Sequence, residues 1–192
     1  IHSFPTRRSS DLEVDEFTRE GALIYCNEVL KHFNQRGGKF LPGLYPVSNN
    51  VHLGSLVGAT PDGREAYQPI ADGVSPTRGA DVNGPTAAAN SVAKLEHYAA
   101  PSGTLFNQKF NPSSLKGDNG LRNLGTLIRS YFDHKGMHIQ FNVVDKNVLL
   151  DAQKHPEKYR DLIVRVAGYS AQFICLNKEI QDDIIKRTEQ EL

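Results

Sequence analysis

Gly168 is the residue whose type and position in this sequence could support unusual chemistry. It lies in the segment RVAGYSA (residues 165–171), at the end of the apolar run 162–166 and just before the chain must change direction. Glycine adopts left-handed backbone conformations freely and lets the backbone approach another group closely. Taken alone, a glycine in this position only indicates a turn.

Other groupings of reactive residue types predict little chemistry. His134 and His138 have a metal-like spacing, but Gly136 interrupts the predicted helix between them, so we expect no metal site. Cys26 and Cys175 lie far apart without CxxC spacing, which indicates neither a disulfide framework nor a zinc site. We expect each to be a small buried hydrophobe. The glycine-rich stretches GVSPTRG and VNG lack the strand-to-helix context of a phosphate loop.

The surroundings of Gly168 extend into a long series of motifs. RVAGYSA is followed by DDIIKRT (residues 182–188), and the pair resembles the C-terminal signature of the glycyl radical enzymes. The resemblance runs from about Gly43 to the end of the sequence. In chain order, the matching segments are GLYPVSNNV, GATPDGR, ADGVSP, NGPTAA, SVAKL, NQKFNPSSLKG, QFNVVD and DAQKHPEKY. A colinear series of this extent makes chance agreement a poor explanation.

The resemblance implies that Gly168 stores an organic radical. In this family the glycine of the RVxGY motif is the radical carrier, and the motif is supported here by Arg165, Val166, Tyr169 and Ser170. The family installs the radical with a separate iron–sulfur activase that uses S-adenosylmethionine. The resemblance therefore implies an activase as a protein partner, and no cofactor bound by this chain.

The chemistry explains why a glycine is needed. A radical on an α-carbon is stabilised by the amide nitrogen on one side and the carbonyl on the other, provided that all these atoms become coplanar. A side chain would obstruct the flattening, whereas glycine has none and offers two α-hydrogens.

Four further residues are candidates for the neighbourhood of the site. The resemblance places the segment of Tyr45 beside the substrate, where its hydroxyl could hydrogen-bond or donate a proton; a half-buried strand aromatic is the alternative. Asn107 and Asn142 lie in predicted strands that should approach the same cavity, without a specific role. Arg165 is expected to tie the radical loop to a carboxylate, or else to be a solvated arginine.

The family passes the radical to a cysteine in a Gly-Cys-x-Glu-like motif, and that motif is absent from this sequence. Cys26 lies on a predicted helix and Cys175 too close to Gly168, so we expect no turnover by this chain alone. The leading hypothesis is the C-terminal fragment of a radical lyase or dehydratase that cleaves C–O or C–N bonds. The alternatives are a formate acetyltransferase (pyruvate formate-lyase) and a stand-alone glycyl radical module that repairs a damaged enzyme.

Composition points to a globular protein that is not a nucleic-acid binder. Lysine plus arginine balance aspartate plus glutamate at 22 each, and no basic stripe with interleaved aromatics appears. No apolar run approaches the ~18 residues of a membrane span. We expect a cytoplasmic protein, with a bacterial microcompartment as an option, a small-molecule substrate for the full-length enzyme, and a homodimer as its assembly.

Hydrophobic periodicity predicts alternating helices and strands. Helices are expected over residues 15–36, 91–98, 121–132 and 178–192, with a short one after Asp145. Strands are expected over residues 45–53, 104–110, 137–144 and 162–166, a tight turn over 58–64, and irregular structure over 67–89. Asp145 and Asn177 are expected helix caps.

These elements predict an α/β fold, the C-terminal part of a glycyl radical enzyme α/β barrel that ends in the glycine radical loop and a terminal helix. Residues 1–12 (IHSFPTRRSSDL) have no periodicity and resemble a translated adaptor sequence, which would imply a truncated gene product. Residues 13–192 form the barrel portion, with the glycine radical domain from about residue 75. We expect apolar strand side chains to stay exposed where a missing part belongs.

Overall fold

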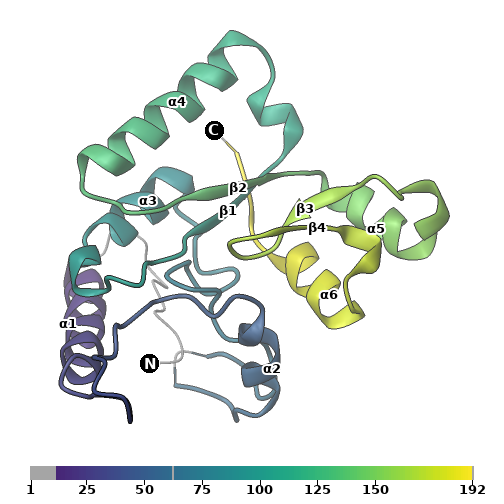
Figure 1. Cartoon of the computed structure of the whole chain (residues 1–192). Coiled ribbons are helices and arrows are strands. Elements are labelled where there is room, and N and C mark those ends of the chain that lie inside the picture. The colour runs from purple at the N-terminus through teal and green to yellow at the C-terminus, as the bar shows by residue number, and fades with distance from the viewer. Residues whose placement is uncertain (1–11, 62, 192) are drawn as a thin grey trace.

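The computed structural model describes residues 12–61 and 63–191, in which helices alternate with short strands (Figure 1). The predicted α/β class is confirmed. Residues 1–11 of the suspected adaptor segment lie outside the described residues, and Leu12 already belongs to the first helix, α1 (Leu12–Val29). No helix in the described part of the chain is both long and apolar enough to cross a membrane.

A parallel sheet lies at the centre of the molecule. Its strands are β1 (Asn107–Phe110), β2 (Gln140–Val143) and β5 (Glu189–Gln190), in the order β2-β1-β5. Parallel neighbours need a long crossover, which η2 (Pro112–Leu115) and α4 (Gly117–Asp133) provide between β1 and β2. The described residues form an open three-stranded sheet, which supports the α/β class. That these strands are part of a larger barrel stays a prediction.

A β-hairpin lies beside this sheet and carries Gly168 between its strands. β3 (Ile163–Arg165) pairs antiparallel with β4 (Ser170–Gln172), and the N–H of Val166 donates to the carbonyl of Tyr169 at 2.9 Å across the tip. The expected loop position of Gly168 is confirmed, while β4 was not predicted. In Figure 1 the hairpin lies with α5 (Lys146–Lys154) and α6 (Lys178–Lys186) at one end of the molecule.

Two predicted helix caps are confirmed at α5 and α6. One carboxylate oxygen of Asp145 accepts from the N–H of Asn147 at 2.6 Å and of Val148 at 3.4 Å. The side-chain oxygen of Asn177 accepts from the N–H of Ile180 at 3.0 Å. The remaining elements are α2 (Asn49–Ser55), α3 (Pro85–Ala93), η1 (His97–Ala99), η3 (Pro156–Lys158) and η4 (Phe173–Cys175).

Several predicted boundaries were wrong in the first half of the chain. Residues 45–53 were expected to form a strand, but α2 occupies residues 49–55 and directs the buried Asn50 side chain toward Asp183 of α6, to which it donates. α1 ends at Val29 rather than at residue 36, because the chain turns back and Phe33 bridges to Lys39. The helix expected at 91–98 is α3, which starts inside the supposedly irregular stretch, and η1 follows it as a separate turn.

The end of the chain also differs from the prediction. The closing helix was expected to reach residue 192, but α6 ends at Lys186 and β5 follows. Arg187 takes an extended backbone, with φ −58° and ψ 139°, which turns the chain back toward the sheet. β5 then pairs with β1, in which Lys109 faces Glu189 and Phe110 faces Gln190.

Two separate apolar clusters hold the fold together. The first cluster joins α1, α3, β1 and α4 and is built around four residues that are at most 4% exposed: Phe106, Phe110, Leu127 and Tyr131. The second cluster joins the hairpin to α5, η4 and α6 through Leu149, Val164, Phe173 and Ile184, which are at most 1% exposed. Gly168 thus lies on a hairpin whose strands pack on their own core.

The irregular stretch before α3 is packed against β1 rather than loose. Gly73 has φ +78°, and a side chain there would lie 2.3 Å from the carbonyl oxygen of Leu105. The N–H of Val74 donates to that same oxygen at 2.9 Å. This close approach, which only glycine permits, places Asp72 and Ser75 next to the start of β1.

Candidate functional site

The hairpin tip holds Gly168 in a conformation that favours glycine. Its φ is +81°, in the left-handed region, and a Cβ added there would lie 3.3 Å from a methyl carbon of Leu105. Gly168 is exposed, whereas its neighbour Ala167 is 1% exposed. Any side chain at position 168 would therefore meet both backbone strain and a tight contact.

Both backbone polar groups of Gly168 have side-chain partners. Its N–H donates to Oε1 of Gln140 at 3.2 Å, and its carbonyl accepts from Nη2 of Arg165 at 3.4 Å. Arg165 also donates from Nε to the same Gln140 oxygen at 2.9 Å and from Nη1 to the hydroxyl of Ser170 at 3.2 Å. The carboxylate expected as the partner of Arg165 is replaced by this amide oxygen, so that part of the prediction was wrong.

The two predicted asparagines connect the hairpin to the sheet. Asn142 of β2 pairs with the backbone of Arg165: its Oδ1 accepts from the N–H at 2.7 Å and its Nδ2 donates to the carbonyl at 2.5 Å. Asn107 of β1 accepts a hydrogen bond from Nε2 of Gln140. Asn142 thus contacts the hairpin directly, and Asn107 reaches it only through Gln140. The expectation that both strands approach one substrate cavity stays a prediction.

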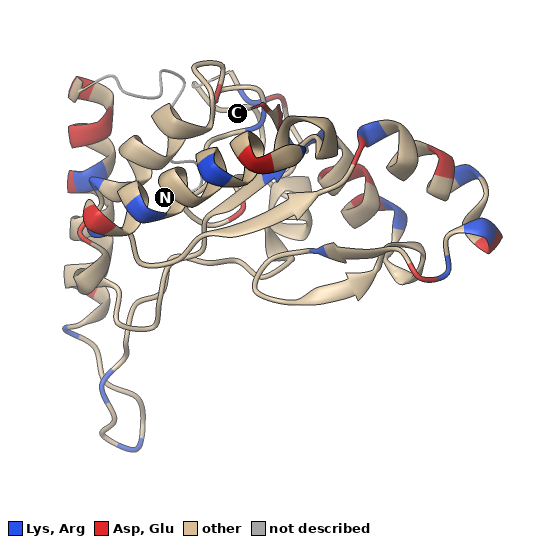
Figure 2. Ribbon diagram, turned by 90° about the horizontal axis from the view of Figure 1, so that it is seen from above, with Lys and Arg blue, Asp and Glu red and all other residues tan. Residues whose placement is uncertain are grey.

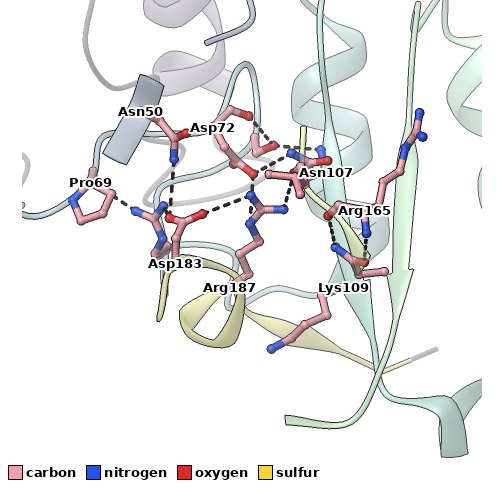
Figure 3. A network of polar contacts seen from close by, with 12 residues as sticks. Asn50, Pro69, Asp72, Asn107, Lys109, Arg165, Asp183 and Arg187 are labelled. Carbon is pink, nitrogen blue, oxygen red and sulfur yellow. Dashed lines mark hydrogen bonds and ion pairs between the residues drawn. The ribbon is translucent and has the colours of Figure 1, made fainter. Parts of the chain in front are cut away.

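These contacts continue from Gln140 into a row of polar residues. The row, here called the polar seam, is formed by Gln140, Asn107, Asp72, Arg187 and Asp183, and Figure 3 labels the last four. Nδ2 of Asn107 donates to Oδ2 of Asp72 at 2.7 Å, and Nε of Arg187 lies 3.3 Å from that same oxygen. Arg187 also pairs with Asp183 at 3.1 Å.

The seam returns to the hairpin through Arg187. Its Nη1 donates to the carbonyl of Val166 at 2.8 Å, two residues before Gly168. The hairpin is therefore held by Gln140 at the Gly168 N–H and by Arg187 at the Val166 carbonyl. The hydrogen bonds of Asn107 to Gln140 and Asp72, and the ion pair of Asp72 with Arg187, connect these two residues.

Charges in the seam are buried and paired. The side chain of Asp183 is 1% exposed and faces Arg187, Arg78 and the amide of Asn50. Burial lowers the pKa of Arg78 to about 10, with the nearby Asp72 raising it and Arg187 lowering it. Burial disfavours the charged form of an acid too, and so raises the pKa of the Asp81 carboxyl. Charged residues of both signs lie mainly on helices and loops, and the strands carry few (Figure 2). Asp183 of α6, Arg187 at its end and Asp72 in a loop follow this distribution.

Two hollows lie near these residues, and neither is lined by Gly168. The one beside the seam has a volume of about 30 Å³, room for a water molecule or two but not for an organic substrate. A hollow of about 510 Å³ lies between α2 and α6. A substrate pocket at the hairpin tip would thus need groups beyond those that line these two hollows.

Tyr45 is connected to the hairpin tip only indirectly, through the segment of Thr104 and Leu105. Its neighbour Leu44 bridges to Thr104, and the next residue, Leu105, is the one that faces Gly168. Tyr45 itself is 45% exposed, and no hydrogen bond or ion pair within the described chain joins it to the hairpin. Its expected role beside a substrate stays a prediction.

The histidines and cysteines considered as metal ligands or reactive thiols have separate surroundings. His134 binds the carbonyl of Ser130 and His138 accepts from the N–H of Phe106, so the two rings have separate partners. No group of three potential metal ligands occurs among the residues that the structure describes. Cys26 is buried as expected, but Cys175 is exposed, with its thiol 3.3 Å from the Gln172 side-chain oxygen, so the prediction of burial was wrong there.

Sequence reasoning did not single out Gln140, Asp72, Asp183 or Arg187. Two signals were available. Gln140 and Asn142 are alternate polar residues of β2 and therefore lie on one face of that strand. Asp183 and Arg187 are spaced by four residues, which places them on one side of the end of α6. Their convergence on the hairpin depends on long-range contacts that no local pattern encodes.

Comparison with known proteins agrees with this geometry. The family described as Glycine radical matches residues 70–174. A solved structure of the B12-independent glycerol dehydratase from Clostridium butyricum has a TM-score of 0.91 and 71% identity over 94% of this chain. The trans-4-hydroxy-L-proline dehydratase of Clostridioides difficile is 47% identical over 97% of the chain, and an isethionate sulfite-lyase of Oleidesulfovibrio alaskensis is 46% identical over 98%.

The chain spans 23% of the length of each of these three proteins. The family match covers residues 70–174 of 192, more than half of the chain, and contains the hairpin tip. The chain therefore belongs to the glycine radical family and corresponds to the C-terminal region of a glycyl radical enzyme.

Proposed function

We propose that Gly168 stores the radical of a glycyl radical dehydratase or lyase, of which this chain is one part. The observation that carries the proposal is the hairpin tip, where a glycine in the left-handed region has both its N–H and its carbonyl bound by side chains. This tip lies inside the matched family region. Removing one hydrogen atom from its Cα would leave an unpaired electron between two held peptide groups.

The activating step needs a partner that takes up that hydrogen atom. The activase that the resemblance implies generates an organic radical from S-adenosylmethionine, and this radical would take the proton and electron from Gly168 together. The exposure of Gly168 suits such an encounter. In turnover the Gly168 radical would take a hydrogen atom from a cysteine thiol, which becomes the thiyl radical that attacks the substrate.

That cysteine is proposed to lie in a part of the enzyme beyond this chain. Cys26 is buried in α1, a helix of the first apolar cluster, whereas the hairpin packs in the second. Cys175 is exposed on η4. The substrate, the activase complex and a homodimeric assembly all belong to the whole enzyme and are part of the proposal.

Bond cleavage of the C–O or C–N type is favoured over acetyl transfer. The relatives named above are two dehydratases and a sulfite-lyase, which supports a radical dehydratase or lyase in general. Their similarity extends over 94–98% of this chain, which also favours an enzyme part over a stand-alone repair module.

The test is Gly168→Ala in the full-length protein, treated anaerobically with activase, S-adenosylmethionine and reductant. Wild type should develop a carbon-centred radical signal in electron paramagnetic resonance, split by the remaining α-hydrogen. The variant should show neither signal nor turnover, because the methyl group opposes planarity and removes one α-hydrogen. Gly125→Ala is the matched control, because this glycine lies in α4 with open space where a Cβ would be added. The Gly125→Ala enzyme should contain as much radical as wild type.

A folded Gly168→Ala variant that accumulates the same radical would contradict the assignment. Circular dichroism and thermal unfolding of both alanine variants check that any loss is not a loss of fold.

A further inference from the structure

We infer that Gln140 is a positioning residue that stabilises the radical state of Gly168, by accepting a hydrogen bond from its N–H while Arg165 donates to its carbonyl. The inference rests on the proposed function. It goes further in assigning residues to the stability of the stored radical, which a glycine alone does not provide.

The orientation of the Gln140 amide is fixed from both ends of a hydrogen-bond chain. At one end, the N–H of Gly168 and Nε of Arg165 are donors only, so the group that faces both must be the amide oxygen. At the other end, the Asp72 carboxylate is an acceptor, which directs the Nδ2 of Asn107 toward it. Oδ1 of Asn107 then faces Nε2 of Gln140, which donates to it.

Burial keeps this acceptor in place. Gln140 is 7% exposed, although the Gly168 that it binds is exposed. Burying an amide is costly unless its hydrogen bonds are made, and Gln140 makes three, to Gly168, Arg165 and Asn107. The contact with Asn107 of β1 comes from outside the hairpin and keeps the amide oxygen directed toward the tip.

The two contacts act on opposite sides of the α-carbon. In the radical, the amide nitrogen donates electron density toward Cα and the carbonyl withdraws it. An acceptor at the N–H makes the nitrogen a better donor, and the Arg165 guanidinium, 3.4 Å from the oxygen, makes the carbonyl a better acceptor. Each contact therefore spreads the unpaired electron further from Cα.

Neither side chain exchanges a proton in this scheme. Gly168 loses one hydrogen atom to the radical made from S-adenosylmethionine during activation, and regains one from a thiol during turnover. Gln140 stays neutral and Arg165 stays protonated throughout. Their effect is on the energy and electron distribution of the Gly168 radical, which spectroscopy can measure separately from turnover.

The experiment compares Gln140→Met and Gln140→Glu in the activated full-length enzyme. Methionine has a similar length but no amide oxygen, so we expect a larger α-hydrogen splitting, because more spin density stays on Cα, and a radical half-life about fivefold shorter. A fivefold change equals about 1 kcal/mol. Glutamate keeps an oxygen acceptor at the N–H and should retain the narrow splitting, even though its contact with Asn107 is lost.

The matched control is Gln172→Met, the same substitution at an exposed position on the same hairpin. Its splitting and half-life should equal those of wild type. A merely structural role of Gln140 would lower the radical yield without moving the splitting.

The outcomes separate the inference from the proposed function. Equal splitting and half-life in wild type and Gln140→Met would overturn the role of Gln140 and leave Gly168 as the carrier. Loss of the radical from Gln140→Met alone supports the inference when thermal unfolding of that variant matches wild type. Loss from both Gln140 variants overturns it, because glutamate keeps the acceptor. Absence of a radical from wild type, with an activase that works on a known enzyme, would reject the proposed function itself.

Discussion

The base and the tip of the 163–172 hairpin are held by different forces. At the base, Val164, Val166 and Phe173 are at most 1% exposed and pack into the second apolar cluster. At the tip, Gly168 is exposed and its peptide groups are bound by the side chains of Gln140 and Arg165. Apolar packing is non-directional, so it fixes where the hairpin lies, while hydrogen bonds fix how the Gly168 peptide groups are oriented.

This division suits a residue that must change its geometry. A Cα that becomes planar alters local backbone angles, and a close-packed core resists such changes. A tip held by side-chain hydrogen bonds can adjust while the base stays fixed. The following predictions test this comparison, from the largest expected effect to the smallest.

The base should carry most of the stability. Phe173→Ala removes a ring that is 0% exposed beneath the hairpin and should lower the free energy of unfolding by about 4 kcal/mol, as measured by urea denaturation of the chain. Ile163→Ala, on the same hairpin but 65% exposed, should cost far less. Similar losses for both would show that the hairpin base is not a packed core.

The polar seam should make the next largest contribution to the free energy of unfolding. Asp183→Asn removes a buried negative charge that pairs with Arg78 and Arg187, and leaves Arg187 with Asp72 as its remaining carboxylate partner. We expect a loss of about 3 kcal/mol in the same assay. The control is Glu179→Gln, an exposed carboxylate on the same helix, which should change stability by less than about 1 kcal/mol. A stable Asp183→Asn protein would mean that the seam contributes little.

Acid should lower the stability of the fold through two partly or fully buried histidines, His97 and His138. Burial lowers the pKa of His97 below 6.5, and burial together with the Arg165 charge lowers that of His138. The unfolded chain therefore binds protons first as the pH falls through 6.5, so stability is full above that pH and is lost below it, until the folded pKa values are passed.

Each histidine contributes at most about 1.4 kcal/mol per pH unit to this slope. Urea denaturation at several pH values between about 7 and about 5 measures it. The pair of substitutions His97→Gln and His138→Gln should flatten the slope, whereas the exposed His52→Gln should leave it intact. A wild-type stability that does not change over this range would contradict the prediction.

Elements with strong local signals could be predicted from the sequence. The caps of Asp145 and Asn177 mark the starts of α5 and α6 because a side-chain oxygen binds free first-turn amides whatever the rest of the chain does. The apolar periods of α4 and β3 likewise reflect a single buried face. Gly168 could be identified because its motif is contiguous.

Elements that depend on distant partners could not be predicted. β5 has two residues and exists through its pairing with β1, so its sequence reads as a continuation of α6. A strand was expected at residues 45–53, but residues 49–55 form α2, whose buried Asn50 side chain contacts Asp183 of α6, a partner that no local pattern indicates. For α3 a local signal did exist, since Pro85 at the first helical position is typical of a helix start.

The candidate site shows the same limit. Gly168 and Arg165 belong to one motif, but Gln140 and Arg187 reach the hairpin from β2 and from the end of α6. A glutamine in a strand and an arginine after a helix are ordinary solvated residues in most sequences. Only the fold shows that both bind the backbone of the hairpin.

The most direct test of the central claim is to expose the activated full-length enzyme to oxygen and determine where the chain breaks. A radical on Gly168 should react with oxygen at its Cα and cleave the chain there, as the family resemblance implies. Mass spectrometry should then find a C-terminal peptide that begins just after position 168, and none from Gly168→Ala. Cleavage at another glycine, or an activated protein that stays intact in oxygen while retaining its radical, would contradict the assignment of Gly168.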